Sequence, residues 1–510
     1  MFVSMNNRVS ITDLYMTNSA FENLCARFRE IDRLQHAITY LNWDQMVVMP
    51  PKGSEARSGS IAELAGISHA KLTAPEVSDW LAELEDSEVN KLSIREMKRA
   101  WRNANCLPAE LVKEQIVVGS KCEMGWRTQR AANDWQGFVK NFKPVVELSR
   151  QEARCRKQAS AATTPYEAML ALHCHGDSES LIDSIFKKLR QVLPDLLQQV
   201  MDKQGDLQIS EKADYPVEQQ ISLNKEMLTT LGFDFEAGRL DQSMHPFSTG
   251  SAGDSRITTR YETDSFLEAL AGTAHEVGHA SYESQLPEEL RGLPVGESRN
   301  MCIHESQSLL FEKQIFFSRS FMQFLTAKIH HHLPAAASLD ANDLWKLGTR
   351  VVPGKIRVEA DEVTYPLHVM LRYEIESALI NGEIEADDIP DMWNEKMQSY
   401  LGIDTKGDYT NGCLQDIHWT DGAFGYFPSY TIGAINAAQI FTTIKSAHPD
   451  WQEQFKRGDV QFVRDWLLEN IWSKGCQLES QELMRHATGS ATRAESLIEH
   501  LQARYLRAEY

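Results

Sequence analysis

Residues 265–280 read SFLEALAGTAHEVGHA, and this segment contains an HExxH pentapeptide formed by His275, Glu276 and His279 with two residues between. Apolar residues recur at helical spacing along the segment, so the sequence predicts a helix. Residues four positions apart share one face of a helix, which should direct the imidazoles of His275 and His279 toward one point. Two such imidazoles are typical zinc ligands, and Glu276 lies close enough to act as general base on a bound water. The alternative is a helix with two solvated histidines.

A catalytic zinc keeps three protein ligands and one open position, so the pentapeptide needs a partner from elsewhere in the chain. Residues 298–312 are predicted to form a second helix, and Glu305 on it is the first candidate for the third ligand. The alternatives are His304, Glu283 and Glu312. His304 points about 100° away from Glu305 on a helix, so the two cannot both bind the ion easily. An isolated glutamate can also be a solvated surface residue.

Polar residues before both segments predict where the two helices begin. Ser265 and Glu268 fit a capping box, and Ser298 is in a position to cap the second helix. Similar apolar spacing predicts helices over residues 20–42, 55–70, 90–160, 178–205, 300–333 and 360–382. Residues 238–264 instead indicate two short strands with a glycine-rich turn. We therefore expect a mainly α fold round one deep groove, with a small β-sheet next to the zinc-binding helices.

Several ordered blocks resemble the Taq-type thermostable carboxypeptidase family of zinc metallopeptidases. The run HESQS at 304–308 follows HEVGH at 275–279 as it does in that family. The other blocks are HPF at 245–247, DSRIT at 254–258, IRVEADE at 356–362, GCLQDIHW at 412–419, and LNWDQ at 41–45 followed by Met49 and Pro50. The resemblance extends over nearly the whole chain. Leu309 is a departure from the family pattern, because the family often has arginine at this position. The absence of that arginine removes one possible charge partner near the ligands.

The resemblance implies a zinc carboxypeptidase that removes single residues from the C-termini of peptides. It also implies helical lobes on either side of a cleft, with the zinc at its floor. Residues 1–510 would form one catalytic unit, in which N-terminal helices within about residues 1–100 cover part of the groove. A homodimer is implied as well. Zinc is the expected cofactor, with cobalt or manganese as substitutes.

Further side chains are needed for peptide hydrolysis at such a site. Tyr430, in a stretch that reads as a loop, and His418 are candidates to donate a hydrogen bond to the oxyanion. A carboxypeptidase also needs a fixed cation for the terminal carboxylate of its substrate. Arg357 is the first candidate for this cation and Arg256 the second. Gln415 is a candidate contact for the substrate backbone.

Two acidic residues in the IRVEADE block have two interpretations. Asp361 and Glu362 either accept hydrogen bonds from His275 or His279, and so orient these rings, or are solvated. Three functions are compatible with the residues quoted so far. They are a carboxypeptidase, an oligopeptidase that cuts inside short peptides with the same site, and a catalytically silent helical scaffold. The intact Glu276 argues against the scaffold, since a structural metal site needs no general base.

Composition excludes several partners. The chain carries 52 basic and 72 acidic residues, a net charge of −20, which argues against binding to nucleic acid or to an anionic membrane. Apolar runs stay below the 18 or so residues that a membrane helix needs. The N-terminal residues lack a basic start followed by an apolar stretch, so no secretory signal is expected. The eight cysteines form no CxxC pair and are expected to be reduced thiols in a cytoplasmic protein.

Overall fold

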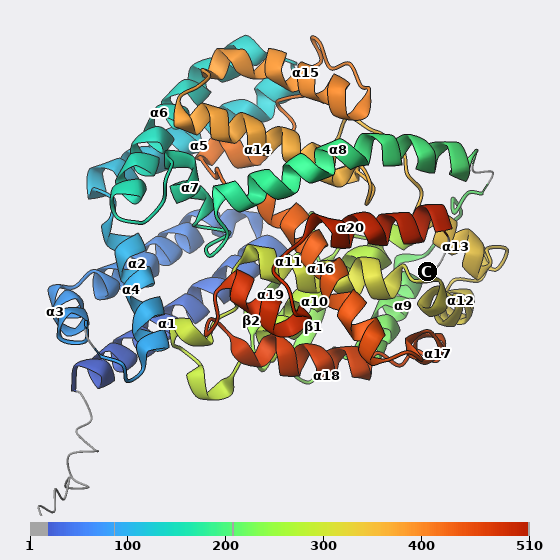
Figure 1. Ribbon diagram of the computed structural model, residues 1–510, viewed down its shortest axis with the longest axis horizontal. Helices are drawn as coiled ribbons and strands as arrows, with labels where there is room; N and C mark the ends of the chain where they lie inside the picture. The colour runs from blue at the N-terminus through green and yellow to red at the C-terminus, as the bar shows by residue number, and fades with distance from the viewer. Residues whose placement is uncertain (1–18, 86, 207–208, 508–510) are drawn as a thin grey trace, which may run out of the picture.

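The computed structural model describes residues 19–85, 87–206 and 209–507, so the expectations about the first 18 residues lie outside the described part. Helices dominate the fold, as predicted (Figure 1). The first four pack together in the N-terminal part: α1 (Ser19–Val47), α2 (Ser54–Leu72), α3 (Pro75–Glu83) and α4 (Lys91–Asn105). The predicted helical run over 90–160 is in fact three helices, because turns interrupt it near residues 107 and 133.

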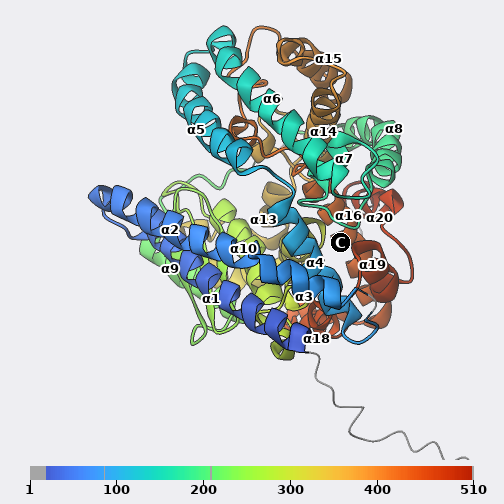
Figure 2. The ribbon, with the colours of Figure 1, turned by 90° about the vertical axis from the view of Figure 1, so that its left-hand side faces the viewer.

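Most of the remaining helices pack around two larger hydrophobic cores. One core is built by α5 (Ala109–Ala131), α6 (Trp135–Gln158), α7 (Pro165–Leu170), α8 (Glu179–Gln204), α14 (Tyr365–Asn381) and α15 (Ile389–Leu401). The other is built mainly by α9 (Val217–Thr230), α10 (Leu267–Ser284), α12 (Arg319–His332), α13 (Ala341–Gly348), α17 (Trp451–Lys456), α18 (Gln461–Asn470) and α19 (Ser480–Thr488). The helices of the two cores form separate lobes (Figure 2). This arrangement agrees with the expectation of helical lobes.

A central helix joins the two lobes. Helix α16 (Pro428–Ala447) places Ile432 and Ile435 in the first core, and Ile440 and Phe441 in the second. It packs along α11 (Met301–Leu309), and α20 (Ala494–Leu501) packs beside it. Helix α16 was not among the predicted helices. Tyr430, which was expected in a loop, lies in the first turn of this helix.

A small sheet packs against α10. It has three strands where two were predicted: β1 (Gly238–Gln242), β2 (Ser248–Ser251) and β3 (Asp254–Thr259), in the order β1-β3-β2. Strand β3 pairs in parallel with β1 and antiparallel with β2, through a turn at Gly253 whose φ is +88°. The hydroxyl of Thr259 donates to the carbonyl of Ala269 at 3.2 Å. This bond ties the sheet to the helix that carries the HExxH motif.

Both predicted helix caps were wrong. Helix α10 begins at Leu267 without a side-chain cap, and the Ser265 hydroxyl donates instead to Glu211 at 2.5 Å. Helix α11 is capped by Asn300, whose side chain accepts from the amide of Ile303 at 3.0 Å. The hydroxyl of Ser298 donates to Glu283. Within the described ranges, we find no helix long and apolar enough to cross a bilayer.

Candidate metal centre

Two helices bring three ligand-type side chains together. Helix α10 presents His275 and His279 on one face, and α11 presents Glu305. Oε2 of Glu305 lies 3.7 Å from Nε2 of His275 and 3.9 Å from Nε2 of His279. The three ligand atoms all lie within 4.8 Å of one another. The structure thus brings together the three residues that the sequence suggested as ligands.

The separations suit a zinc ion. A tetrahedral zinc with bonds of about 2.0–2.1 Å holds its ligand atoms about 3.3–3.4 Å apart. The two nitrogen–oxygen distances, 3.7 and 3.9 Å, exceed this value by about 0.3–0.6 Å, so a small inward movement of the side chains would bring them to it. Burial, followed by repulsion from His304 and His275, holds the pKa of His279 well below its usual range. The ring of His279 is therefore neutral, as a metal ligand must be.

Two glycines allow the three helices at the centre to approach closely. A Cβ on Gly278 of α10 would lie 2.5 Å from the carbonyl oxygen of Gln307 and 2.6 Å from Cα of Ser308, both on α11. A Cβ on Gly433 of α16 would lie 2.6 Å from Cβ of Glu305. Helix α11 is therefore held between α10 and α16, and the position of Glu305 depends on both contacts.

Glu276 lies beside the ligands and is almost fully buried, with 7% of its surface exposed. Burial raises the pKa of Glu276 to about 7; the nearby His275 opposes the shift and Glu305 adds to it. A carboxylate in these surroundings exchanges a proton readily near neutral pH. Among the described residues, no hydrogen bond to the Glu276 side chain is found.

Side chains behind the two histidines contact the Nδ1 atoms of both imidazoles. Nδ1 of His275 lies 2.9 Å from Glu312, which also pairs with Lys313 at 2.6 Å. Burial alone would lower the pKa of His275, but the hydrogen bond and charge of Glu312 outweigh it and raise this pKa to about 9. A metal ion bound at Nε2 would therefore displace a proton from this ring. Glu312 and Lys313 lie on a π-helix, Leu310–Phe316, which continues α11. Such segments are common at functional sites.

The second imidazole has a different neighbour. Nδ1 of His279 lies 2.5 Å from Nδ1 of His304, whose Nε2 lies 2.8 Å from Glu283. The expectation that Asp361 or Glu362 orients the ligands is not met. Asp361 accepts from the amides of residues 363 and 364, and Glu362 pairs with His500 and Arg504. Both carboxylates therefore have hydrogen-bond partners other than His275 and His279.

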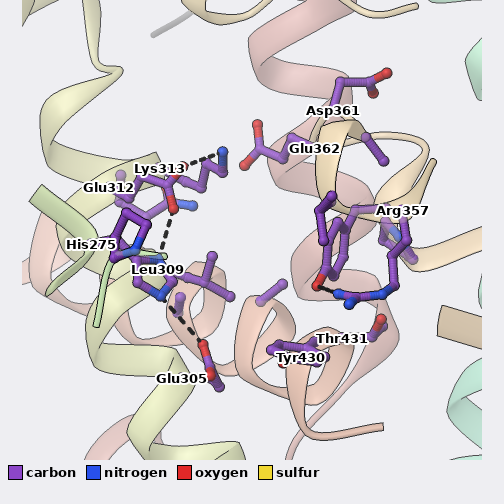
Figure 3. A pocket seen from close by; sticks show the side chains of 18 residues that line it. His275, Glu305, Leu309, Glu312, Lys313, Arg357, Asp361, Glu362, Tyr430 and Thr431 are labelled. Carbon is purple, nitrogen blue, oxygen red and sulfur yellow. Dashed lines mark hydrogen bonds and ion pairs between the residues drawn. The ribbon is translucent and has the colours of Figure 1, made fainter. Parts of the chain in front are cut away.

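A cavity of about 420 Å³ opens beside the ligands. His275 and Glu305 lie on one side of it, and Arg357 and Tyr430 face them (Figure 3). Leu309 also lines the cavity, so the departure from the family pattern places an apolar side chain next to the ligands. Lys313 and Tyr365, which the sequence analysis did not single out, line the same cavity.

Arg357 combines burial with an excess of positive charge. Only 5% of its surface is exposed; Nε lies 3.0 Å from Asp416, and Nη1 donates to the hydroxyl of Tyr365 at 2.7 Å. Asp416 also accepts from Arg372 at 2.6 Å. One carboxylate thus serves two guanidinium groups. The pair of arginines retains one positive charge, which a substrate carboxylate in the cavity can balance.

The other predicted contacts occupy different places. Arg256 on β3 is held by Asp254 at 2.5 and 2.9 Å and stacks on Trp43. Gln415 accepts from the amide of Arg357 at 2.8 Å and donates to backbone carbonyls, so its amide supports Arg357. Neither is found among the described residues that line the cavity. The structure therefore does not place Arg256 or Gln415 where the sequence analysis expected a substrate contact.

His418 lies in a short 3₁₀-helix, Ile417–Asp421, and packs against the ring of Phe427. Burial lowers the pKa of His418 to about 4, so the ring is neutral. Its Nδ1 is buried without a hydrogen-bond partner among the described residues. Tyr430 lines the cavity and His418 is not among the described lining residues, which favours Tyr430 as the oxyanion donor.

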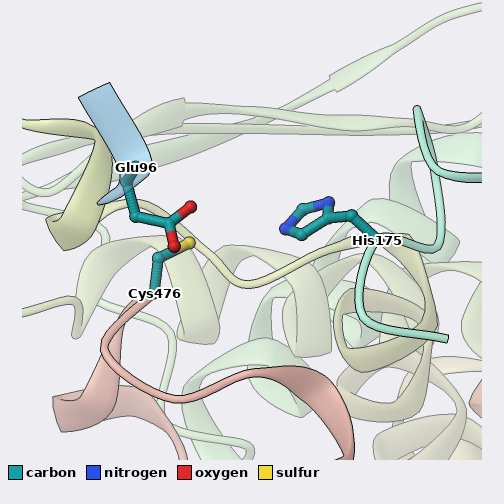
Figure 4. Close-up of side chains that lie close together, drawn as sticks. All are labelled: Glu96, His175 and Cys476. Carbon is teal, nitrogen blue, oxygen red and sulfur yellow. The ribbon is translucent and has the colours of Figure 1, made fainter. Parts of the chain in front are cut away.

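A second cluster of ligand-type residues does not suit a cation. Glu96, His175 and Cys476 place ligand atoms within 4.8 Å of one another (Figure 4). Glu96 is already surrounded by three guanidinium groups, at 2.7, 2.6 and 3.3 Å, from Arg95, Arg99 and Arg299. Burial raises the pKa of Cys476 to about 12, so it stays a thiol. Positive neighbours and a protonated sulfur both disfavour a metal ion here.

Comparison with known proteins places the chain in a family. Residues 23–505 match the Carboxypeptidase Taq (M32) metallopeptidase family. The chain belongs to this family. Thermostable carboxypeptidase 1 of Thermus thermophilus is 34% identical over 96% of this chain and 98% of its own length. Carboxypeptidase 1 of Bacillus subtilis is 33% identical over 94% and 96%.

Solved structures agree with this assignment. Metallocarboxypeptidase 1 of Trypanosoma cruzi has a TM-score of 0.93 and 38% identity, and the match covers 96% of this chain and 99% of that one. Pyrococcus furiosus carboxypeptidase has a TM-score of 0.92 and 32% identity over 96% and 99%. The protein is therefore a metallocarboxypeptidase, a peptide hydrolase of the Taq family, as the sequence blocks indicated.

Proposed function

We propose that this metallocarboxypeptidase uses zinc, held by His275, His279 and Glu305, to remove single residues from peptide C-termini. The observation that carries the proposal is the cluster of these three side chains, of which His275 and Glu305 line a cavity that Arg357 also lines. A bound zinc would acidify a water and polarise the scissile carbonyl. Cobalt or manganese would satisfy the same ligand set.

Glu276 is proposed as the general base. It takes a proton from the attacking water and later passes that proton to the leaving amine. Its burial and raised pKa suit a group that must both accept and release a proton near pH 7. Tyr430 is proposed to donate a hydrogen bond to the oxyanion, supported by its place on the cavity wall. His418 is the alternative donor.

Arg357 is proposed to bind the terminal carboxylate of the substrate. Its guanidinium is fixed by Asp416 and Tyr365, so little side-chain freedom is lost when a carboxylate binds. Anchoring the C-terminus on Arg357 would place a peptide bond near the metal ligands. The second candidate is an oligopeptidase, which would use the same metal site without this anchor.

Matched peptides with free and amidated C-termini distinguish the two functions. We expect the free peptide to be cut and its amide to resist, because the amide has no charge for Arg357. The peptide sequence, salt and metal concentration are kept the same. Equal rates on the two peptides, with internal fragments as products, would support the oligopeptidase and contradict the proposal.

The location and assembly of the enzyme are part of the proposal. All eight cysteines are free thiols, six of them buried, which supports a reducing cytoplasm. We propose a homodimer of single catalytic units, on the family likeness alone.

Helix α1 packs on β2, and the hydroxyl of Tyr40 donates to the carbonyl of Asp254 at 2.7 Å. Strand β2 also packs against α10, and we propose from this proximity that N-terminal helices cover part of the groove.

A further inference from the structure

Three side chains that rivalled Glu305 as the third ligand lie in one layer behind the two imidazoles. Glu312 contacts His275, whereas His304 contacts His279 and is itself contacted by Glu283. The first imidazole therefore has a carboxylate as its neighbour and the second has another imidazole. A hydrogen bond between two Nδ1 atoms restricts which of the two rings carries the proton.

The protons along the second chain can be assigned step by step. Nε2 of His279 faces Glu305, so its lone pair must be free if this atom binds a metal. A neutral imidazole carries one N–H, which places the proton of His279 on Nδ1. That N–H donates to Nδ1 of His304, which must then be unprotonated. The proton of His304 is on Nε2, where Glu283 accepts it at 2.8 Å.

We propose that His304 and Glu283 are positioning residues that hold His279 as an Nε2 ligand. This inference rests on the proposed function. Glu283 fixes the tautomer of His304, and His304 fixes the tautomer and ring orientation of His279. The hydroxyl of Ser298 anchors Glu283 at 2.7 Å, so the chain of hydrogen bonds ends on a fixed group. Tyr282 packs against the His304 ring with 5.3 Å between centroids and restrains its plane.

The arrangement gives α11 two tasks. Glu305 points toward the metal ligands of α10, while its neighbour His304 turns about 100° away and reaches His279 from behind. Helix α11 therefore supplies a ligand of its own and orients a ligand of α10. Orienting partners of this kind typically change metal affinity by 10–100-fold when removed.

Zinc affinity, measured by competition with a chromophoric chelator, tests the proposal without relying on turnover. His304→Phe keeps a ring of similar size but cannot accept from His279, and we expect zinc affinity to fall by about 10–100-fold. His304→Asn places Oδ1 where Nδ1 was, so affinity should recover to within a few-fold of wild type. Glu283→Ala should weaken affinity less than His304→Phe, because His304 can still accept. His331→Phe, at an exposed histidine, should leave affinity unchanged.

The outcomes separate the inference from the proposed function. Wild-type affinity in His304→Phe, or an Asn variant as weak as the Phe variant, would overturn the positioning role. If His304→Phe does not fold, the same decision rests on whether His304→Asn binds zinc more tightly than Glu283→Ala. A wild-type protein that binds no zinc, or a His279→Ala variant that binds as tightly as wild type, would instead refute the metal centre itself.

Discussion

Glu276 is the residue on which the proposed chemistry depends most directly. We expect Glu276→Gln to lower kcat by about 10²–10⁴-fold, because the amide cannot accept the proton of the water. Metal content should stay near that of wild type, since Glu276 is not among the proposed ligands. Metal analysis and kinetics on one preparation check both expectations. Substantial hydrolysis by the variant would rule out Glu276 as the base.

Asp416 should make stability depend on pH through its two arginines. Burial would raise the pKa of Asp416, but Arg372 and Arg357 outweigh it and lower the pKa to about 2. A carboxyl with a lowered folded-state pKa stabilises the fold above its unfolded value near 3.8 and loses this effect as the pH falls toward 2. The stability advantage over Asp416→Asn should shrink by about 1 kcal/mol between pH 6 and pH 3.

Denaturant unfolding of both proteins at the two pH values measures this change. Asp408→Asn, at a partly exposed carboxylate bound to Lys355, is the comparison: its pKa is also lowered, so its advantage should change in the same direction but by less than that of the buried Asp416. An advantage that is constant or grows on acidification would contradict the role of Asp416 as a charged partner of Arg357.

Single residues show which features of the site could be predicted from the sequence and which could not. The HExxH spacing was enough to predict that His275 and His279 share a helix face, because both lie within one turn. The resemblance directed attention to Arg357. The partner of Arg357 could not be predicted, since Asp416 is 59 positions away and meets it only through tertiary packing. His304 and Glu312 were considered only as ligands, because their contacts with Nδ1 depend on how α11 turns against α10.

At the scale of helices, the approach of α10 to α11 depends on Gly278. A Cβ there would meet backbone atoms of α11 at 2.5–2.6 Å, so Gly278→Ala must push the helices apart. We expect zinc affinity to fall at least tenfold, as Glu305 moves relative to the histidines. Gly272, in the same helix, has only Pro246 at 3.9 Å from a built Cβ.

Gly272→Ala is therefore the matched control. It should leave zinc affinity unchanged and stabilise the fold by about 0.5–1 kcal/mol, since alanine is the better helix former. Equal zinc affinity in the two variants would show that the close helix contact does not position Glu305.

Some helices could be predicted from the sequence and others could not. Amphipathic helices such as α8 were found because their buried residues recur three and four positions apart. Helix α16 was missed because it is buried on most sides, so its sequence lacks a polar face. The π-helix at Leu310–Phe316 has no spacing signal, since its shifted hydrogen bonds are set by packing. The wrong caps show the same effect: Ser265 and Ser298 bind distant carboxylates instead of the nearest helix end.

At the scale of the whole molecule, the metal centre is supported by packing that does not need the ion. Two large cores and the shared helix α16 hold α10 and α11 in place. We therefore expect the chelator-treated protein to stay folded, with an unchanged far-ultraviolet circular dichroism spectrum. Free zinc at 100 times its Kd should add about 2.7 kcal/mol of stability and raise Tm by a few degrees.

Thermal unfolding at a fixed scan rate, with and without zinc, measures this shift. Glu305→Ala provides the control, because zinc should no longer raise its Tm. Loss of helical structure on chelation would mean that the ion is a folding element and not only a catalytic one.

The central claim is that a divalent ion binds between α10 and α11. A crystal of the zinc-loaded protein, with anomalous data collected on both sides of the zinc edge, tests it most directly. We predict one strong peak at about 2.0–2.2 Å from Nε2 of His275, Nε2 of His279 and a carboxylate oxygen of Glu305. A peak at Glu96, His175 and Cys476 instead, or no peak between the two helices, would contradict the account.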